Sequence, residues 1–125
     1  MFYYILMGNL SSGSFADIYV DSALETITSN DLMKLGDFDT IIFKRVSEKT
    51  GLSEGQIKSM HHAFHWSLFN EPSSPFYLHY SGKAGDDWRI KPRNGSVPKK
   101  TDLINYVLGK YGVWLENRFQ NLKRG

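Results

Sequence analysis

Hydrophobic and polar residues follow two different periods along this chain, and its N-terminal part is strand-like. MFYYILM, residues 1–7, is an unbroken apolar and aromatic run, which is typical of a buried strand. NLSSGS follows as a turn, and FADIYV, residues 15–20, alternates enough to be an antiparallel partner. The pattern therefore predicts an N-terminal β-hairpin.

A short helix is expected after this hairpin. Ser29 or Asn30 can cap the segment DLMKL, and Gly36 would end it. Residues 1–37 are thus predicted to form a β-hairpin and a short helix.

Two amphipathic helices separated by a glycine are expected in the middle of the chain. In residues 37–50 the apolar side chains fall at helical spacing, and Gly51 ends the segment. Ser53 can cap the second helix, with Glu54 in the first turn, where a negative charge is favourable. Pro72 prevents this helix from continuing.

The remaining residues predict a second hairpin and a last helix. Phe76–Tyr80 and Trp88–Lys91 are strand-like runs on either side of the glycine-rich turn SGKAGDD. Thr101 or Ser96 can cap a C-terminal helix that contains DLINYVLGKYGVWLENRFQNL.

Together these elements predict one α+β domain in three parts. They are the N-terminal hairpin with its short helix (1–37), the central helix pair with the second hairpin (38–93), and the C-terminal helix (94–125). A chain of 125 residues is long enough to bury a core of its own.

Composition narrows the class of protein. The chain is 41% hydrophobic and 22% charged, as in ordinary globular domains. It contains no cysteine, which excludes disulfides and cysteine-ligated zinc and favours a reducing compartment. The apolar start lacks the basic residues of a signal peptide, and no stretch approaches the roughly 18–20 apolar residues of a membrane-spanning helix. We expect a soluble cytoplasmic protein that does not contact a membrane.

The net charge of +2 conceals an asymmetry. Residues 1–82 carry five Lys and Arg against nine Asp and Glu, whereas residues 83–125 carry ten against four. This distribution favours one basic face for an anionic partner and another face that avoids it. The alternative is a solvated surface whose charges segregated by chance.

The glycine between the central helices is part of a longer pattern. A helix-turn-helix has an apolar and a small residue in its first helix and a left-handed glycine four positions after the small one. Apolar residues on the inner face of the second helix complete it. The matching positions are Val46, Ser47, Gly51, Leu52, Ile57 and Met60. EKTGLSEGQI resembles the centre of this motif in bacterial and phage regulators, although Ser47 stands where alanine is usual and Gly55 weakens the second helix.

A helix pair followed by a basic hairpin resembles the winged form of the helix-turn-helix fold. The resemblance covers residues 38–93 and implies that the second helix enters the major groove of DNA while the hairpin contacts the backbone. The implied contacts on that helix are Ser53, Gln56, Lys58, Ser59 and His62. Gln56 would contact adenine, and Lys58 and Ser59 would meet phosphate. The hairpin would add Lys83, Arg89, Lys91 and Arg93.

Further cations precede the last helix. Lys99 and Lys100, with Lys91 and Arg93, would hold a phosphate at the helix N-terminus. A Lys-Lys pair at such a position is also found in double-stranded-RNA-binding domains, but the sheet of that family is not evident here. Solubilising charges around a loop are the alternative.

Two other interpretations of the helix pair remain open. The segment 45–64 and KKTDLINYV loosely resemble the first helices of histone-like HU proteins, whose long basic β-arms the chain lacks. A glycine is also the commonest way to end the first of two purely structural helices.

All four histidines fall between residues 61 and 79. His61 and His65 are neighbours on one helical face and could bind a metal. The HExxH pattern is absent, Glu71 is the only acid close by in sequence, and a site would have to recruit His79 or a distant carboxylate. We therefore predict packing and surface roles for these histidines, with no metal site.

No motif for catalysis is evident. The chain has no GxSxG, P-loop or GxGxxG, and Asp86 and Asp87 are typical turn residues. We predict no catalytic residues and no cofactor.

The expected function is a small nucleic-acid-binding regulator that is not an enzyme, with duplex DNA as its partner. The C-terminal helix has apolar side chains on much of its circumference, which fits either a homodimer contact or core packing. The alternatives are a phage- or bacteria-encoded adaptor or inhibitor that binds a protein and mimics nucleic acid with its acids, and a metal-dependent enzyme centred on His61 and His65.

Overall fold

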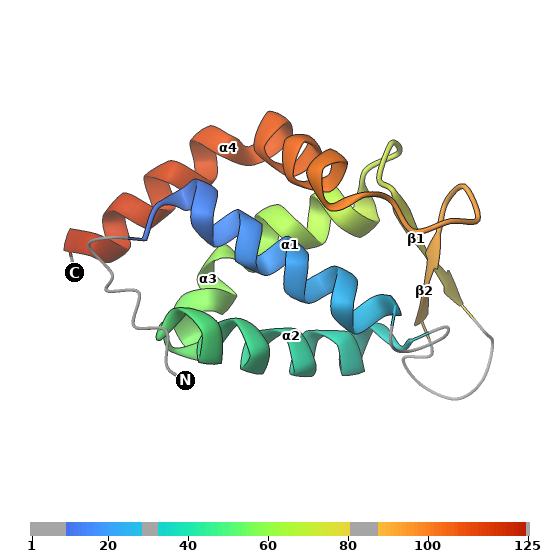
Figure 1. The fold of residues 1–125 in the computed structure, drawn as a ribbon, viewed down its shortest axis with the longest axis horizontal. Coiled ribbons are helices and arrows are strands. Elements are labelled where there is room, and N and C mark those ends of the chain that lie inside the picture. Colours follow the sequence, from blue (N-terminus) through green and yellow to red (C-terminus); the bar gives the residue numbers. More distant parts are fainter. Residues whose placement is uncertain (1–9, 29–32, 81–87, 125) are drawn as a thin grey trace.

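The computed structural model describes residues 10–28, 33–80 and 88–124. Figure 1 shows helices packed around one another, with a small hairpin at one end of the long axis. The elements are α1 (Ser12–Thr28), α2 (Leu35–Thr50), α3 (Glu54–His65), the π-helical segment η2 (Trp66–Asn70), β1 (Phe76–Tyr80), β2 (Trp88–Pro92) and α4 (Lys100–Arg124). The α+β class is confirmed, but the expected order is not, because helices come first.

The predicted N-terminal hairpin is wrong for the described residues. FADIYV lies inside α1, and the run 1–7 lies outside the described residues. Phe15, Tyr19 and Thr26 are buried along one side of this helix. The six residues 15–20 are too few to distinguish this helical spacing from the alternation of a strand. The supposed turn is instead a helix start. Ser11 and Ser14 cap it reciprocally, each side-chain hydroxyl accepting a hydrogen bond from the other's backbone N–H at 2.9–3.0 Å.

The boundary expected at Gly36 is also wrong. Leu35 already begins α2, so Gly36 lies in its first turn, and the candidate caps Ser29 and Asn30 lie outside the described residues. A Cβ added at Gly36 would have no atom within 4 Å, and the φ of Gly36 is not positive. Nothing in the local geometry therefore ends a helix at this residue.

The central helix pair is as predicted. Gly51 ends α2 with φ +78°, and its N–H donates to the carbonyl of Ser47 at 2.9 Å. Ser53 then caps α3, as expected. Val46, Ile57 and Met60 are fully buried, so the apolar positions of the pattern do face inward.

The second hairpin is confirmed, and the structure adds its register. β1 and β2 are antiparallel, with Leu78 opposite Ile90 and Phe76 opposite Pro92. The free edge of β2 is extended by Met33 and Lys34, because the Ile90 N–H donates to the Met33 carbonyl at 3.0 Å. The hairpin is therefore tied to the start of α2.

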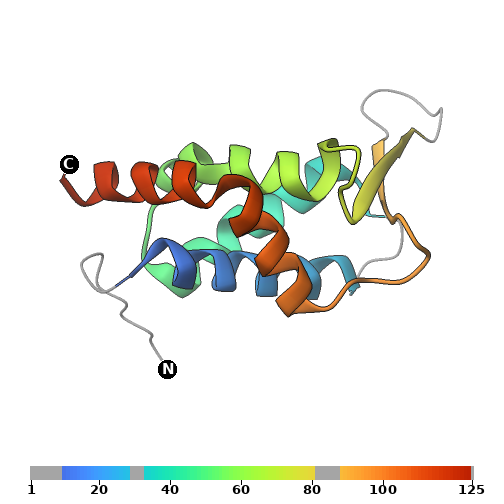
Figure 2. The same cartoon turned by 90° about the horizontal axis from the view of Figure 1, so that it is seen from above.

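The last helix closes the core. α4 begins at Lys100, so Thr101 lies in its first turn and does not precede it as a cap. Figure 2 shows that α4 changes direction along its length while it covers α1 and α3, which its side chains contact. Leu103, Val107 and Phe119 are buried in the same core as residues of α1, α2, α3 and the hairpin. The three sequence segments therefore share one core.

At the centre of that core, aromatic rings from two helices stack. The Tyr19 and Phe64 ring centroids are 3.9 Å apart, and Phe15 meets Phe64 edge-on at 5.8 Å.

Of the helices described, none is long and apolar enough to cross a membrane.

Candidate functional site

The start of α3, expected to contact bases, is occupied by its own cap. The Gln56 side-chain oxygen accepts a hydrogen bond from the Ser53 N–H at 2.9 Å, while the Ser53 hydroxyl accepts from the Gln56 N–H at 3.1 Å. The Ser59 hydroxyl donates to the Gln56 carbonyl at 2.6 Å. A bidentate contact from Gln56 to adenine would have to break this capping box.

Lys58 and His62 lie further along α3, and both are exposed. The His62 ring contacts three other rings, those of Trp66, Tyr111 and Trp114, at centroid distances of 5.6–6.1 Å. His62 is therefore part of an aromatic surface shared by α3, η2 and α4.

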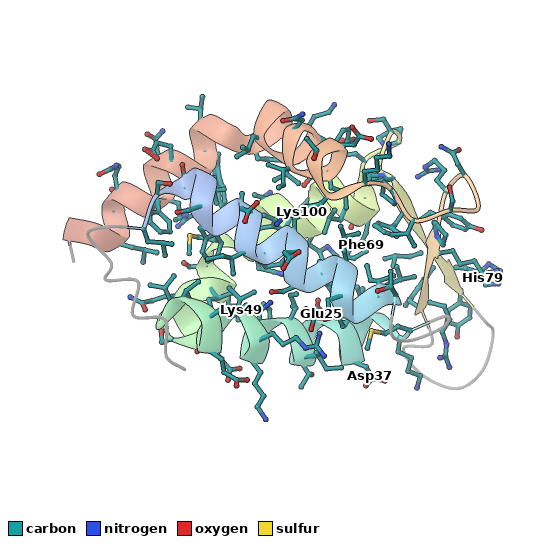
Figure 3. All side chains as sticks on the ribbon, viewed as in Figure 1. Glu25, Asp37, Lys49, Phe69, His79 and Lys100 are labelled. Atoms are coloured by element: carbon teal, nitrogen blue, oxygen red, sulfur yellow. The ribbon has the colours of Figure 1, made fainter. Side chains whose placement is uncertain are left out.

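The hairpin gathers the predicted cations on one face. Tyr77 lies opposite Lys91, and His79 lies opposite Arg89. These four residues form what we call the outer hairpin face. The alternate positions lie on the other face, where Phe76 and Ile90 are buried, whereas Tyr80 and Trp88 at the tip end are exposed. In Figure 3 the His79 side chain points away from the rest of the molecule.

Arg93 adjoins this face. Its Nε donates to the Ser74 carbonyl at 2.7 Å, and its guanidinium lies 5.8 Å from the centre of the Tyr77 ring. Lys83, the cation expected at the hairpin tip, lies outside the described residues.

The helix pair and the hairpin do not form one surface. The Gly51 turn and the start of α3 lie at one end of the long axis, and the hairpin lies at the other end, in both Figure 1 and Figure 2. The side chains expected to share one duplex are thus divided between two regions.

The two lysines at the start of α4 have different surroundings. Lys99 is exposed, but Lys100 contacts the carboxylates of Asp17 and Asp21 on α1 at 3.2 and 3.5 Å. These contacts compete with a phosphate for the Lys100 ammonium group.

The histidines occupy a different kind of site, between α1, α2 and α3. Asp39 of α2 lies beside His61 and His65 of α3, and one potential ligand atom from each lies within 4.8 Å of the other two. His61 Nε2 and Asp39 Oδ1 are 3.8 Å apart. The carboxylate is distant in sequence, whereas Glu71, the acid close by in sequence, accepts a hydrogen bond from the Tyr111 hydroxyl.

Each imidazole in this cluster has a neighbour that fixes its orientation. His61 Nδ1 is 3.1 Å from the hydroxyl of Tyr19, which is fully buried. His65 forms a side-chain hydrogen bond with Asn70 of η2. The Phe43 ring contacts the His61 ring edge-on at 5.0 Å.

Burial sets the protonation of the cluster. It raises the pKa of Asp39 from 3.8 to about 6 and lowers the pKa of His61 from 6.5 to about 4, with His65, Lys58 and His62 adding repulsion at His61. Burial also lowers the pKa of His65. At pH 7 the carboxylate is mainly charged and both imidazoles are mainly neutral.

The cluster borders solvent on one side. A hollow of about 330 Å³ is lined by Lys58, His61, His62, His65 and Trp66. His65 is the last residue of α3, where the chain widens into the π-helical segment, and such segments are frequent at functional sites.

Asp39 is the member of this cluster that sequence reasoning missed. The rest of α2, the turn at Gly51 and the start of α3 lie between Asp39 and His61 in the sequence. No local spacing therefore connects the two residues. The available signal was an acid beside Phe38 in a helix whose buried positions are mostly apolar.

The chain has no match among known protein families, curated proteins or solved structures. Its function is therefore inferred from the geometry and chemistry of its own residues.

Proposed function

We propose that the chain is a small nucleic-acid-binding regulatory protein that makes its main contact through the outer hairpin face. The observation that carries the proposal is the β1–β2 register, in which Tyr77 is paired with Lys91 and His79 with Arg89. Cross-strand pairing places basic and aromatic groups side by side, the combination that contacts phosphates and stacks on bases.

The distribution of charge supports this face over the acidic helix α1. Asp17 and Asp21 are near Lys100, and Glu25 forms an ion pair with Arg45 at 2.8 Å. Figure 3 shows Glu25 and Lys49 on neighbouring helices, 3.8 Å apart at their charged atoms. Acids paired within the chain are poor mimics of a phosphate backbone, which disfavours the alternative of an inhibitor that imitates nucleic acid.

Aromatic side chains on the opposite face of the same hairpin, next to its tip, add a surface for base stacking. Tyr80 and Trp88 are 46% and 43% exposed, and their ring centroids are 5.0 Å apart. A hollow of about 510 Å³ at the foot of the hairpin is lined by Leu35, Phe69, Asn70, Tyr77, Leu78 and Trp88. Stacking on such rings tolerates any sequence, whereas cation–phosphate contacts provide affinity that falls with salt.

The proposal is tested by fluorescence anisotropy with short labelled duplex and single-stranded DNA over a salt series. If Arg89, Lys91 and Arg93 each neutralise one phosphate, the logarithm of duplex affinity falls with log salt at a slope of roughly −3. Lys91→Glu is expected to lower affinity at least tenfold at low salt and to reduce the slope by about 1.

The matched control is Lys44→Glu, which makes the same charge change at an exposed position of α2, away from the hairpin. Equal losses of affinity in the two variants would show that the effect comes from net charge alone. The outer hairpin face would then not be the contact. Absence of binding by the wild-type protein to either polymer at low salt would exclude the function.

A further inference from the structure

Asp39, His61 and His65 have the donor set and spacing of a metal site that is independent of the hairpin. Two imidazole nitrogens and one carboxylate oxygen converge from two helices, all within 4.8 Å of one another. Ligands about 2.0–2.2 Å from a tetrahedral ion are separated by about 3.3–3.6 Å. The 3.8 Å between His61 Nε2 and Asp39 Oδ1 is already near that separation.

One oxygen of the cluster lacks the partner that its burial demands. Asp39 Oδ1 is inaccessible to solvent and accepts no hydrogen bond from the described residues. A buried carboxylate oxygen without a donor is destabilising, and at 3.8 Å the His61 ring is too distant for a hydrogen bond. A cation between the two side chains would satisfy this oxygen.

The second layer of contacts is arranged as around metal-bound histidines. With the His61 Nδ1–H donating to the Tyr19 hydroxyl oxygen, the Nε2 lone pair is directed toward Asp39. The ring of Tyr19 is itself fixed by its stack on Phe64, so the orientation is built into the core. Asn70 holds the ring of His65 by a side-chain hydrogen bond.

We propose that Asp39, His61 and His65 bind one divalent transition-metal ion, with Zn²⁺ as the representative ion. Two imidazoles disfavour Mg²⁺ and Ca²⁺, which prefer oxygen ligands, and the absence of cysteine disfavours Cu(I). Three protein ligands leave a fourth tetrahedral position, and the hollow lined by Lys58, His62 and Trp66 gives water or another oxygen ligand access to it.

The protonation of the cluster is consistent with this assignment. Metal ions require neutral imidazoles and an ionised carboxylate, and the burial of these groups gives both forms at pH 7. The groups that face the ion are Tyr19 from α1, Asp39 from α2, and Lys58, His62 and the two ligating histidines from α3.

The experiment is a titration of the full chain, freed of metal by a chelator, with Zn²⁺ by calorimetry and with Co²⁺ by visible absorption. The wild-type protein is expected to bind one equivalent and to give the intense bands of tetrahedral Co²⁺. Asp39→Asn and His65→Ala are each expected to weaken binding at least tenfold. His79→Ala is the matched control, because it removes an exposed histidine of β1 that belongs neither to the cluster nor to the hollow beside it.

Thermal unfolding provides a second measurement that separates loss of the ligand from loss of the fold. Excess Zn²⁺ is expected to raise the Tm of the wild type and of His79→Ala, but not of a folded Asp39→Asn variant. The proposal is overturned if the wild type binds no Zn²⁺, or if Asp39→Asn and His65→Ala weaken binding no more than His79→Ala does.

Discussion

The histidine cluster and the outer hairpin face place polar groups in opposite ways. In the cluster, half-buried side chains from α2 and α3 meet beside the buried Tyr19 of α1, and one carboxylate oxygen has no hydrogen-bond donor among the described residues. On the hairpin, neighbours in two short strands point outward in a row. The first arrangement depends on the whole core, whereas the second depends mainly on strand alternation.

This difference has a consequence for what each region can recognise. Buried ligands in a fixed geometry select a small ion by its coordination preferences. Exposed cations on a hairpin recognise a polyanion mostly by charge, and their affinity is screened by salt. Mutations that loosen the core should therefore affect the cluster more than the hairpin.

The largest effect is expected from a core substitution beneath the cluster. Phe64→Ala removes a fully buried ring that stacks on Tyr19, and we expect it to lower the free energy of unfolding by about 3–5 kcal/mol. Trp66→Ala, two residues further along the chain and 42% exposed, should cost about 1 kcal/mol or less. Urea unfolding at pH 7 measures both. Equal losses would mean that the cluster does not rest on the Tyr19–Phe64 stack.

The next effect concerns the turn that brings α3 back against α2. Gly51 has φ +78° and no atom within 4 Å of an added Cβ, so Gly51→Ala introduces backbone strain alone and should destabilise by about 1–2 kcal/mol. Gly109→Ala is the control: it lies in α4, also without close neighbours but without positive φ, and should stabilise by up to about 1 kcal/mol. Thermal unfolding should shift in opposite directions. A shift of the same sign would contradict the role of the left-handed turn.

A smaller, pH-dependent effect is expected from Asp39→Asn without metal. Because the folded-state pKa of Asp39 is raised to about 6, its contribution to stability is present below pH 3.8 and is lost as pH rises through 6. The lowered pKa of His61 acts oppositely: its contribution is present above pH 6.5 and is lost as pH falls through about 4. At pH 7, therefore, replacing the charged carboxylate should stabilise the protein by about 1 kcal/mol, after allowance for solvent screening.

This gain should diminish toward pH 4, where Asp39 is protonated in the folded wild type. Urea unfolding in the presence of a chelator at pH 7 and pH 4 measures it. An Asp39→Asn variant that is less stable than the wild type at pH 7 would identify Asp39 as a structural partner of His61, not as a carboxylate held for a cation.

Sequence reasoning was most successful where local rules decide the structure. The αL glycine at Gly51, the cap at Ser53 and the register-forming runs of the hairpin each depend on a few adjacent residues. It failed at residues 15–20, where a short alternating run belongs to a 17-residue helix. Dimerisation through α4 stays a prediction, although Leu103, Val107 and Phe119 pack within the chain.

By itself, the sequence determined the helix pair, the hairpin and the cations that the hairpin carries, because each is specified by spacing along a continuous segment. Only the tertiary structure decided that the Gly51 turn and the hairpin lie at opposite ends, and that Asp39 meets His61 and His65. The reason is that helix packing fixes which faces come together, and contacts between distant residues leave no period in the chain.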